Sequence, residues 1–147
     1  MRFRYPLQKI VDLKSSEKSM AEWAYAAALG RLRQEEETLG ALLSERETVE
    51  AQMAQTASAR VTLAELAAIQ HYLDVLDRRI QRQRERVETA EAQVRVKRNG
   101  LVEKSVDEKV WLNTREKAFE AFKQDWLKKQ QNELDEIAMV RFAAGRT

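Results

Sequence analysis

The sequence contains no cysteine, one proline and four glycines in 147 residues. Without cysteine there can be no disulfide, no thiolate nucleophile and no sulfur-ligated metal. So few prolines and glycines leave almost no turn signals for repeated hairpins or for alternating strands and helices. Aromatic residues make up only 7% of the chain, and no run of about 18 apolar residues could cross a membrane. Neither a membrane protein nor a chain rich in strands is expected.

The composition that remains favours long helices. Charged residues make up 34% and apolar residues 44% of the chain, which is too apolar for a disordered tail. The 26 basic and 24 acidic residues nearly cancel to a net charge of +2, so no overall field attracts nucleic acid or an anionic membrane. No apolar stretch that could serve in a signal peptide follows the basic residues at the N-terminus. We expect a soluble cytoplasmic protein.

Local signals place the boundaries of two helices. Thr62 and Glu65 form a capping box, flanked by an apolar residue on each side, so a helix should begin at Thr62. The small and polar stretch before it reads as a connection, over about residues 54–61. Pro6 suits a first helical turn. The prediction is an all-α unit over residues 1–147, with helices over about 6–53 and about 63–142.

Both predicted helices carry an apolar stripe with the alternating three and four spacing of a heptad repeat. Such a stripe needs a partner helix, so the two should form an antiparallel coiled-coil hairpin. Polar residues interrupt both stripes. The second helix places on its stripe Leu66, Ile69, Leu73, Leu76, Ile80, Gln83, Val87, Ala90 and Val94. The first places Ala21, Tyr25, Ala28, Leu32, Glu35, Leu39, Leu42, Arg46, Val49 and Met53.

The spacing restricts the register of the hairpin. Seam positions face each other only if the numbers of partner residues sum to 108, 115 or 122, and a turn centred between Ala57 and Ser58 selects 115. That register sets Leu42 against Leu73 and Val49 against Leu66. It also brings the acidic residues 35–37 near three arginines of the second helix, Arg78, Arg79 and Arg82.

The same register leaves the end of the second helix without a partner. It pairs Leu7 with Glu108, so the 38 residues after Lys109 should overhang. Half of the ten aromatic residues lie there, and their exposure would make a binding surface or a dimer surface. These are Trp111, Phe119, Phe122, Trp126 and Phe142, with Leu134 and Ile137 continuing the stripe. Two alternatives stay open: the overhang frays or folds back, or the Asn99-Gly100 step bends the helix.

No constellation of residues supports catalysis. His71 is the only histidine and could offer, with Asp74, two ligands where a zinc site needs three or four. The carboxylates at residues 35–37 are flanked by arginine, and nothing indicates the burial that general-acid use requires. There is no glycine-rich phosphate loop. We therefore predict no enzyme, no metal and no cofactor.

Both ends of the chain carry a resemblance to a known family. The opening run RFRYPLQKIVDLK over residues 2–14, with Glu17-Lys18 after it, resembles the start of FliJ, a small coiled-coil protein of the bacterial flagellar type III export apparatus. The segment LDEIA over residues 134–138, followed by Arg141-Phe142, is similar to that family's end. The chain length, the place of the turn and the QHYL stretch over residues 70–73 also match.

The resemblance implies a fold and a set of partners. The fold would be an antiparallel coiled coil similar to the part of the ATP synthase γ subunit inside the catalytic ring. The partners would be the ring of the export ATPase FliI, the export gate protein FlhA and export chaperones. The location would be cytoplasmic, at the inner membrane under the flagellum, with membrane contact only through partners.

The resemblance also implies contact residues. By comparison with the γ subunit, the end where the two termini meet would enter the ring. The expected contacts with the ATPase are then Phe3, Tyr5, Phe119, Phe122 and Trp126. A gate contact would involve Leu42, Tyr72 and Leu76, although Leu42 and Leu76 also belong to the seam, and core packing is the alternative role for both.

Two other function classes stay open. A free-standing scaffold could dimerise through the aromatic overhang. Nucleic acid could bind over residues 78–98, where eight basic and three acidic residues give a local excess of positive charge. In the register above the acidic residues 35–37 would neutralise several of those arginines, so no nucleic-acid partner is expected.

Overall fold

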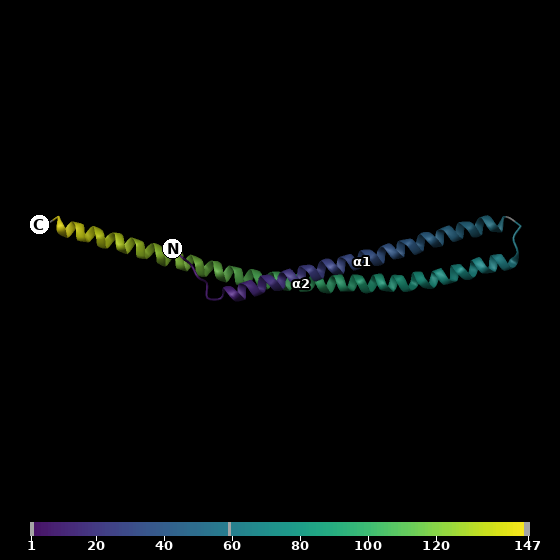
Figure 1. Ribbon diagram of the computed structural model, residues 1–147, viewed down its shortest axis with the longest axis horizontal. Helices are drawn as coiled ribbons and strands as arrows, with labels where there is room; N and C mark the ends of the chain where they lie inside the picture. The colour runs from purple at the N-terminus through teal and green to yellow at the C-terminus, as the bar shows by residue number, and fades with distance from the viewer. Residues whose placement is uncertain (1, 59, 146–147) are drawn as a thin grey trace. The chain divides into compact units, whose positions relative to one another are not determined.

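The computed structural model describes residues 2–58 and 60–145. Helix α1 spans Gln8–Ala57 and helix α2 spans Leu63–Ala144. The contacts divide into two units: unit 1 comprises Met1–Met20 with Val102–Thr147, and unit 2 comprises Ala21–Leu101. Within each unit α1 and α2 run antiparallel (Figure 1). The predicted all-α fold of two long helices packed as an antiparallel hairpin is confirmed, and the described residues include no strand.

Helix α2 begins where the capping box indicated. The Thr62 hydroxyl accepts a hydrogen bond from the Glu65 backbone N–H at 3.3 Å. The Thr62 carbonyl accepts from the N–H groups of Glu65 and Leu66 at 3.1 and 3.3 Å. Thr62 is thus the residue that caps the helix, and it satisfies donors that would otherwise have no partner.

Helix α1 continues four residues beyond Met53, to Ala57. Two of those four residues are alanine, which has the highest helix propensity. The Thr56 hydroxyl is satisfied locally, since it donates to the Gln52 carbonyl at 2.7 Å. At the other end Pro6 lies in a turn, and the Tyr5 carbonyl accepts from the N–H of Gln8, the first helical residue, at 3.1 Å.

The core of unit 2 is a thin seam between the two helices. Val49, Leu73 and Leu76 form its buried cluster, and Leu76 is fully buried. Leu42, Met53 and Ile69 pack against that cluster. All six are positions of the predicted seam.

Gln83 is the one buried polar side chain in the described part of the chain, at 4% exposure. Its amide nitrogen donates to the Glu35 backbone carbonyl at 2.9 Å and also to the Glu35 carboxylate. Both residues break the apolar seam, one on each helix. The structure joins the two breaks to each other, so neither polar group is left without a partner.

The predicted register of 115 is wrong. Val49 shares its cluster with Leu73 instead of facing Leu66, and Arg46 bonds to Asp77. Polar contacts across unit 2 range from a residue-number sum of 117, for Glu45 with Tyr72, to 123 for Arg46 with Asp77. Because α1 ends at Ala57 and α2 begins at Leu63, the midpoint between the helices is residue 60. That midpoint lies closer to the 122 register than to 115.

Helix α2 is continuous through Asn99 and Gly100, so this step does not interrupt the helix. No described residue has a positive φ angle. A Cβ atom built on Gly30, Gly40 or Gly100 would meet nothing within 4 Å. These glycines therefore destabilise the helices through their backbone entropy, and no close packing contact requires a residue without a side chain there.

Replacing Gly40 or Gly100 by alanine should stabilise the protein. Each change should raise the free energy of unfolding by about 0.5 to 1 kcal/mol, because alanine restricts the unfolded chain and suits helical dihedral angles. Urea unfolding followed by circular dichroism measures the effect. A loss of stability in Gly100→Ala would show that the helix needs glycine at this step.

Replacing Gln83 by leucine should also stabilise the protein. Leucine would bury a full apolar side chain in the seam, while the hydrogen bonds lost are worth less, so we expect a gain of about 1 kcal/mol. Gln81→Leu, on an exposed position two residues away, is the matched control and should change stability little. If Gln83→Leu destabilises the fold, the bond to Glu35 contributes more than the apolar contact that replaces it.

Candidate functional site

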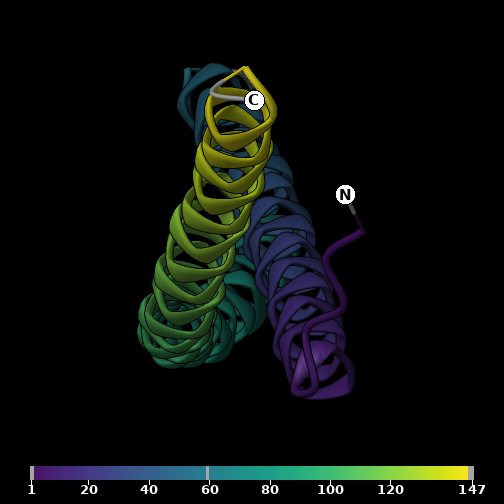
Figure 2. The same ribbon diagram turned by 90° about the vertical axis from the view of Figure 1, so that its left-hand side faces the viewer.

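Unit 1 holds a cluster of aromatic side chains from both ends of the chain. Phe3 lies at its centre, with ring centroids 5.3 Å from those of Phe119 and Phe122 and 6.3 Å from that of Tyr5. We call these four residues the aromatic cluster. Such separations are those of favourable aromatic pairs. The cluster holds the non-helical segment that precedes α1 against α2. Figure 2 shows this segment as a trace without helical turns that leads into α1.

Arg115 connects the aromatic cluster to the start of α1. Its guanidinium carbon lies 5.9 Å from the centre of the Phe3 ring, within cation–π range. Its Nε donates to the Gln8 side-chain oxygen at 2.7 Å. The Tyr5 hydroxyl oxygen is buried and has no hydrogen-bond partner among the described residues. Sequence reasoning missed Arg115 and Gln8, because in the predicted register Arg115 lay beyond the paired part of the helix.

The expectation that α2 has no partner after Lys109 is therefore wrong. Arg115, Phe119 and Phe122 contact residues that precede or begin α1. Trp111 and Trp126 are also partly buried. The predicted overhang exists but starts later: every described residue from 127 to 145 is exposed. The register shift explains the difference, because it moves the N-terminal residues toward higher numbers on α2.

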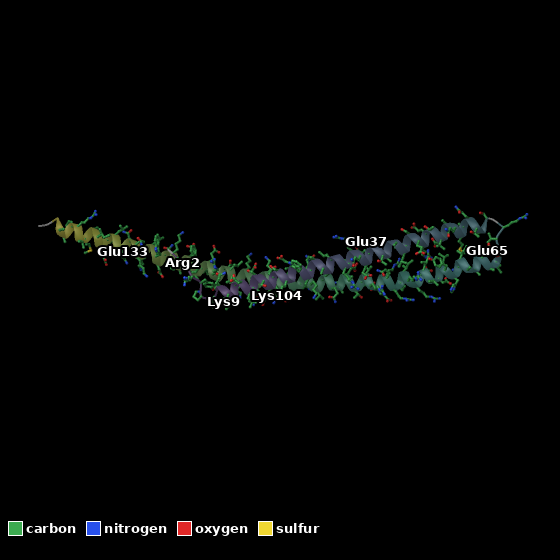
Figure 3. All side chains as sticks on the ribbon, in the orientation of Figure 1. Arg2, Lys9, Glu37, Glu65, Lys104 and Glu133 are labelled. Carbon is green, nitrogen blue, oxygen red and sulfur yellow. The ribbon has the colours of Figure 1, made fainter. Side chains whose placement is uncertain are left out.

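We call residues 127–145 the terminal segment. Apolar side chains one turn apart are exposed along it: Leu134 is 60%, Ile137 52% and Val140 68% exposed. Glu133, Glu136 and Arg141 line a shallow groove with Ile137 and Val140. Figure 3 places Glu133 on a stretch of α2 beside which no other described segment of unit 1 runs. An exposed apolar ridge flanked by charges is typical of a docking surface.

Ion pairs also join the two helices of unit 1, between residues 14–18 of α1 and residues 104–108 of α2. Lys14 pairs with Asp107 at 2.8 Å, and Lys18 pairs with Glu108 at 3.3 Å. Lys104 pairs with Glu17 at 3.3 Å in the opposite sense. A hydrogen bond from the Ser15 hydroxyl, assisted by Lys18, lowers the pKa of the Glu108 carboxyl.

The three residues expected at the export gate lie in different environments in unit 2. Leu76 is fully buried, and Leu42 packs against the same cluster. Only Tyr72 is exposed, at 38%. Its hydroxyl donates to the Glu45 carboxylate, and this bond raises the pKa of Tyr72. Sequence reasoning did not single out Glu45 as a partner of Tyr72.

Chemical sites are sparse in the described residues. No group of three or more histidine, cysteine, aspartate or glutamate side chains there could hold a metal ion. His71 is exposed on α2. Within the same part of the chain, no helix combines the length and the apolarity that a bilayer crossing needs.

Comparison with known proteins decides the family. The sequence model described as "Flagellar FliJ protein" matches residues 3–147. The chain belongs to the FliJ family. It is thus a component of flagellar type III export, as the resemblance of its two ends implied.

A solved structure shares the fold. It is that of the "putative YscO homolog CT670 from Chlamydia trachomatis", with a TM-score of 0.65 and 21% sequence identity. The match covers 99% of this chain and 98% of the other. No curated protein matches the sequence.

Replacing Glu108 by glutamine should weaken unit 1 in a way that depends on pH. Because the folded-state pKa of Glu108 is lowered, its contribution to stability is complete above the unfolded pKa of about 4.3 and is lost as pH falls through the folded pKa. The melting temperature of Glu108→Gln should lie below that of the unchanged protein at pH 7. The two should converge near pH 2, where both side chains are neutral.

Glu103→Gln serves as the matched control, because Glu103 is an exposed carboxylate on the same helix. It should lower the melting temperature little at either pH. An equal loss in both variants at pH 7 would show that the contacts of Glu108 with Ser15 and Lys18 do not stabilise the fold.

Proposed function

We propose that this FliJ-family protein acts as a stalk in the ring of the export ATPase FliI and contacts the ring through the terminal segment and the aromatic cluster of unit 1. The observation that carries the proposal is the terminal segment, where Leu134, Ile137 and Val140 are more than half exposed. Burying exposed apolar side chains of this size against a partner removes apolar surface from water, which favours binding.

The aromatic cluster has a specific part in this proposal. Phe3, Tyr5, Phe119 and Phe122 fix the N-terminal segment on α2, and Trp126 follows at the point where the terminal segment begins. Phe3, Tyr5, Phe119, Phe122 and Trp126 are all partly exposed. They would present their outer edges to the ATPase while their packed sides hold the two ends of the chain together.

A second contact would link unit 2 to the export gate protein FlhA. Tyr72 is the most exposed residue of the proposed set, and the bond to Glu45 holds its ring in place. Leu42 would contribute the exposed part of its side chain, whereas Leu76 would support Tyr72 from within the core. Export chaperones complete the proposed partners. The protein would work at the cytoplasmic face of the inner membrane, reached only through these partners.

The proposed role requires no catalysis by this chain. ATP hydrolysis would belong to the FliI ring, and this protein would bind and regulate it. The exposed ridge of the terminal segment also favours the second candidate function, a scaffold that dimerises through this segment. The two functions differ in the partner that covers the ridge.

Replacing Leu134, Ile137 and Val140 together by serine should abolish stimulation of the FliI ATPase. The helix content of the protein should fall little, because these side chains pack on no other part of the described chain. Phosphate release by FliI, measured against the concentration of the variant, tests this. Val102, Val106 and Val110 offer a matched control: they are exposed to a similar degree, at 54%, 58% and 55%, on the same helix.

The control triple variant should stimulate FliI as the unchanged protein does. Full stimulation by the variant of the terminal segment would refute the proposed contact. If that variant instead loses a dimer that the unchanged protein forms at the same concentration, seen by light scattering, and stimulates FliI normally, the scaffold function replaces the stalk.

A further inference from the structure

Unit 2 contains a groove between α1 and α2, on a part of the hairpin that the proposed contacts do not use. Its volume is about 730 Å³. Four alanines line it, Ala24, Ala27 and Ala28 from α1 and Ala90 from α2. Small side chains at facing positions leave space that leucine or isoleucine fills in the core around Leu76. The groove is therefore a consequence of the local sequence.

The rim of the groove is basic. The basic side chains that line the groove outnumber the acidic ones: the former are Arg31, Arg82, Arg86 and Lys97, and the latter are Glu35 and Glu85. Glu35 is already engaged, since its carboxylate accepts from Gln83 and pairs with Arg31 at 3.6 Å.

The direct pairing expected between the arginines of α2 and the acidic residues 35–37 is not found in the described residues. No ion pair or hydrogen bond joins Arg78, Arg79 or Arg82 to the acidic residues 35–37 within the described chain, and Glu36 and Glu37 are exposed. Arg82 and Arg86 are four residues apart, so they form one ridge whose charge is available to a partner.

We propose that this groove is a docking site for an acidic amphipathic helix of a partner protein. Alanines on the floor would accept the small apolar side chains of a closely packed helix. The basic rim would pair with glutamate or aspartate on the flanks of that helix. The lining residues span 24–35 on α1 and 82–97 on α2. At a rise of about 1.5 Å per residue, this is room for three to four helical turns.

Two other occupants fit less well. The terminal segment of a second copy carries three basic and three acidic residues over 127–145, so it lacks the negative charge that the rim selects. A nucleic acid would match the rim but would gain little from an alanine floor, because no aromatic side chain lines the groove for base stacking.

The test uses two labelled helical peptides of about 16 residues. Both carry the same alanine and leucine stripe, and their flanks carry glutamate in one and lysine in the other. Fluorescence anisotropy measures the binding of each to the full-length protein. We expect the glutamate peptide to bind and the lysine peptide not to bind.

Two variants separate a site from diffuse attraction. Arg82→Glu with Arg86→Glu should weaken the glutamate peptide by at least about tenfold and allow the lysine peptide to bind. Arg84→Glu with Arg95→Glu makes the same change of net charge on exposed residues that do not line the groove. This control should bind the glutamate peptide with little loss. Equal loss in both variants would overturn the proposal.

A further pair of variants tests the floor of the groove without changing charge. Ala24→Trp should fill the groove and prevent binding, whereas Ala26→Trp, on an exposed position outside the lining, should not. Circular dichroism confirms that each variant is folded, and the charge variants decide the question should Ala24→Trp unfold. Unchanged binding by folded Ala24→Trp would overturn the proposal. A second result would also overturn it: single-stranded RNA displaces the peptide and binds folded Ala24→Trp with the same affinity as the unchanged protein. The rim would then be a general anion-binding surface.

Discussion

The fold depends on one constraint: each helix carries an apolar stripe that only the other helix can cover. The described chain has few buried side chains, and only Leu76 is fully enclosed. Two helices packed along one line can enclose few residues on all sides, so most seam residues stay partly exposed. Each seam residue then contributes a small part of the stability, and a change in the size or polarity of one side chain alters the packing only near that residue. This is why one sequence can carry surfaces of different character along the same pair of helices.

The seam changes character along unit 2. Around Leu76 it is filled by large aliphatic residues, and at Gln83 it turns polar, with the bond to Glu35 holding the helices together. Beyond that bond alanines take over, and the groove opens. In unit 1 ion pairs such as Lys14 with Asp107 span the helices, and then the aromatic cluster follows. Exposed ion pairs contribute little to stability, so the aromatic cluster is the stronger attachment of the N-terminal segment.

The sequence predicted the helices and the seam well because both follow from local rules. The capping box at Thr62 placed the start of α2, and the heptad spacing identified the buried residues of unit 2. It did not identify Val11 in unit 1, which is 3% exposed. The register was not predicted, because heptad arithmetic allows sums seven apart and only the length of the connection chooses between them. Ala54 and Ala57 extended α1 and moved that choice. The aromatic cluster was missed as a packed unit because Phe3 lies outside any helix, where periodicity carries no information.

The end of the seam determines what kind of surface the protein can offer beyond it. Past Trp126 no described part of the chain covers α2, so the terminal segment must be stabilised by contacts within one helix. Gln131 donates to Asp135, four residues away, at 3.0 Å. Pairs of this kind stabilise isolated helices by a few tenths of a kcal/mol each. Because the terminal segment is already helical, binding a partner does not have to order it, and less conformational entropy is lost. The apolar ridge from Leu134 to Val140 can therefore contribute most of its burial energy to binding.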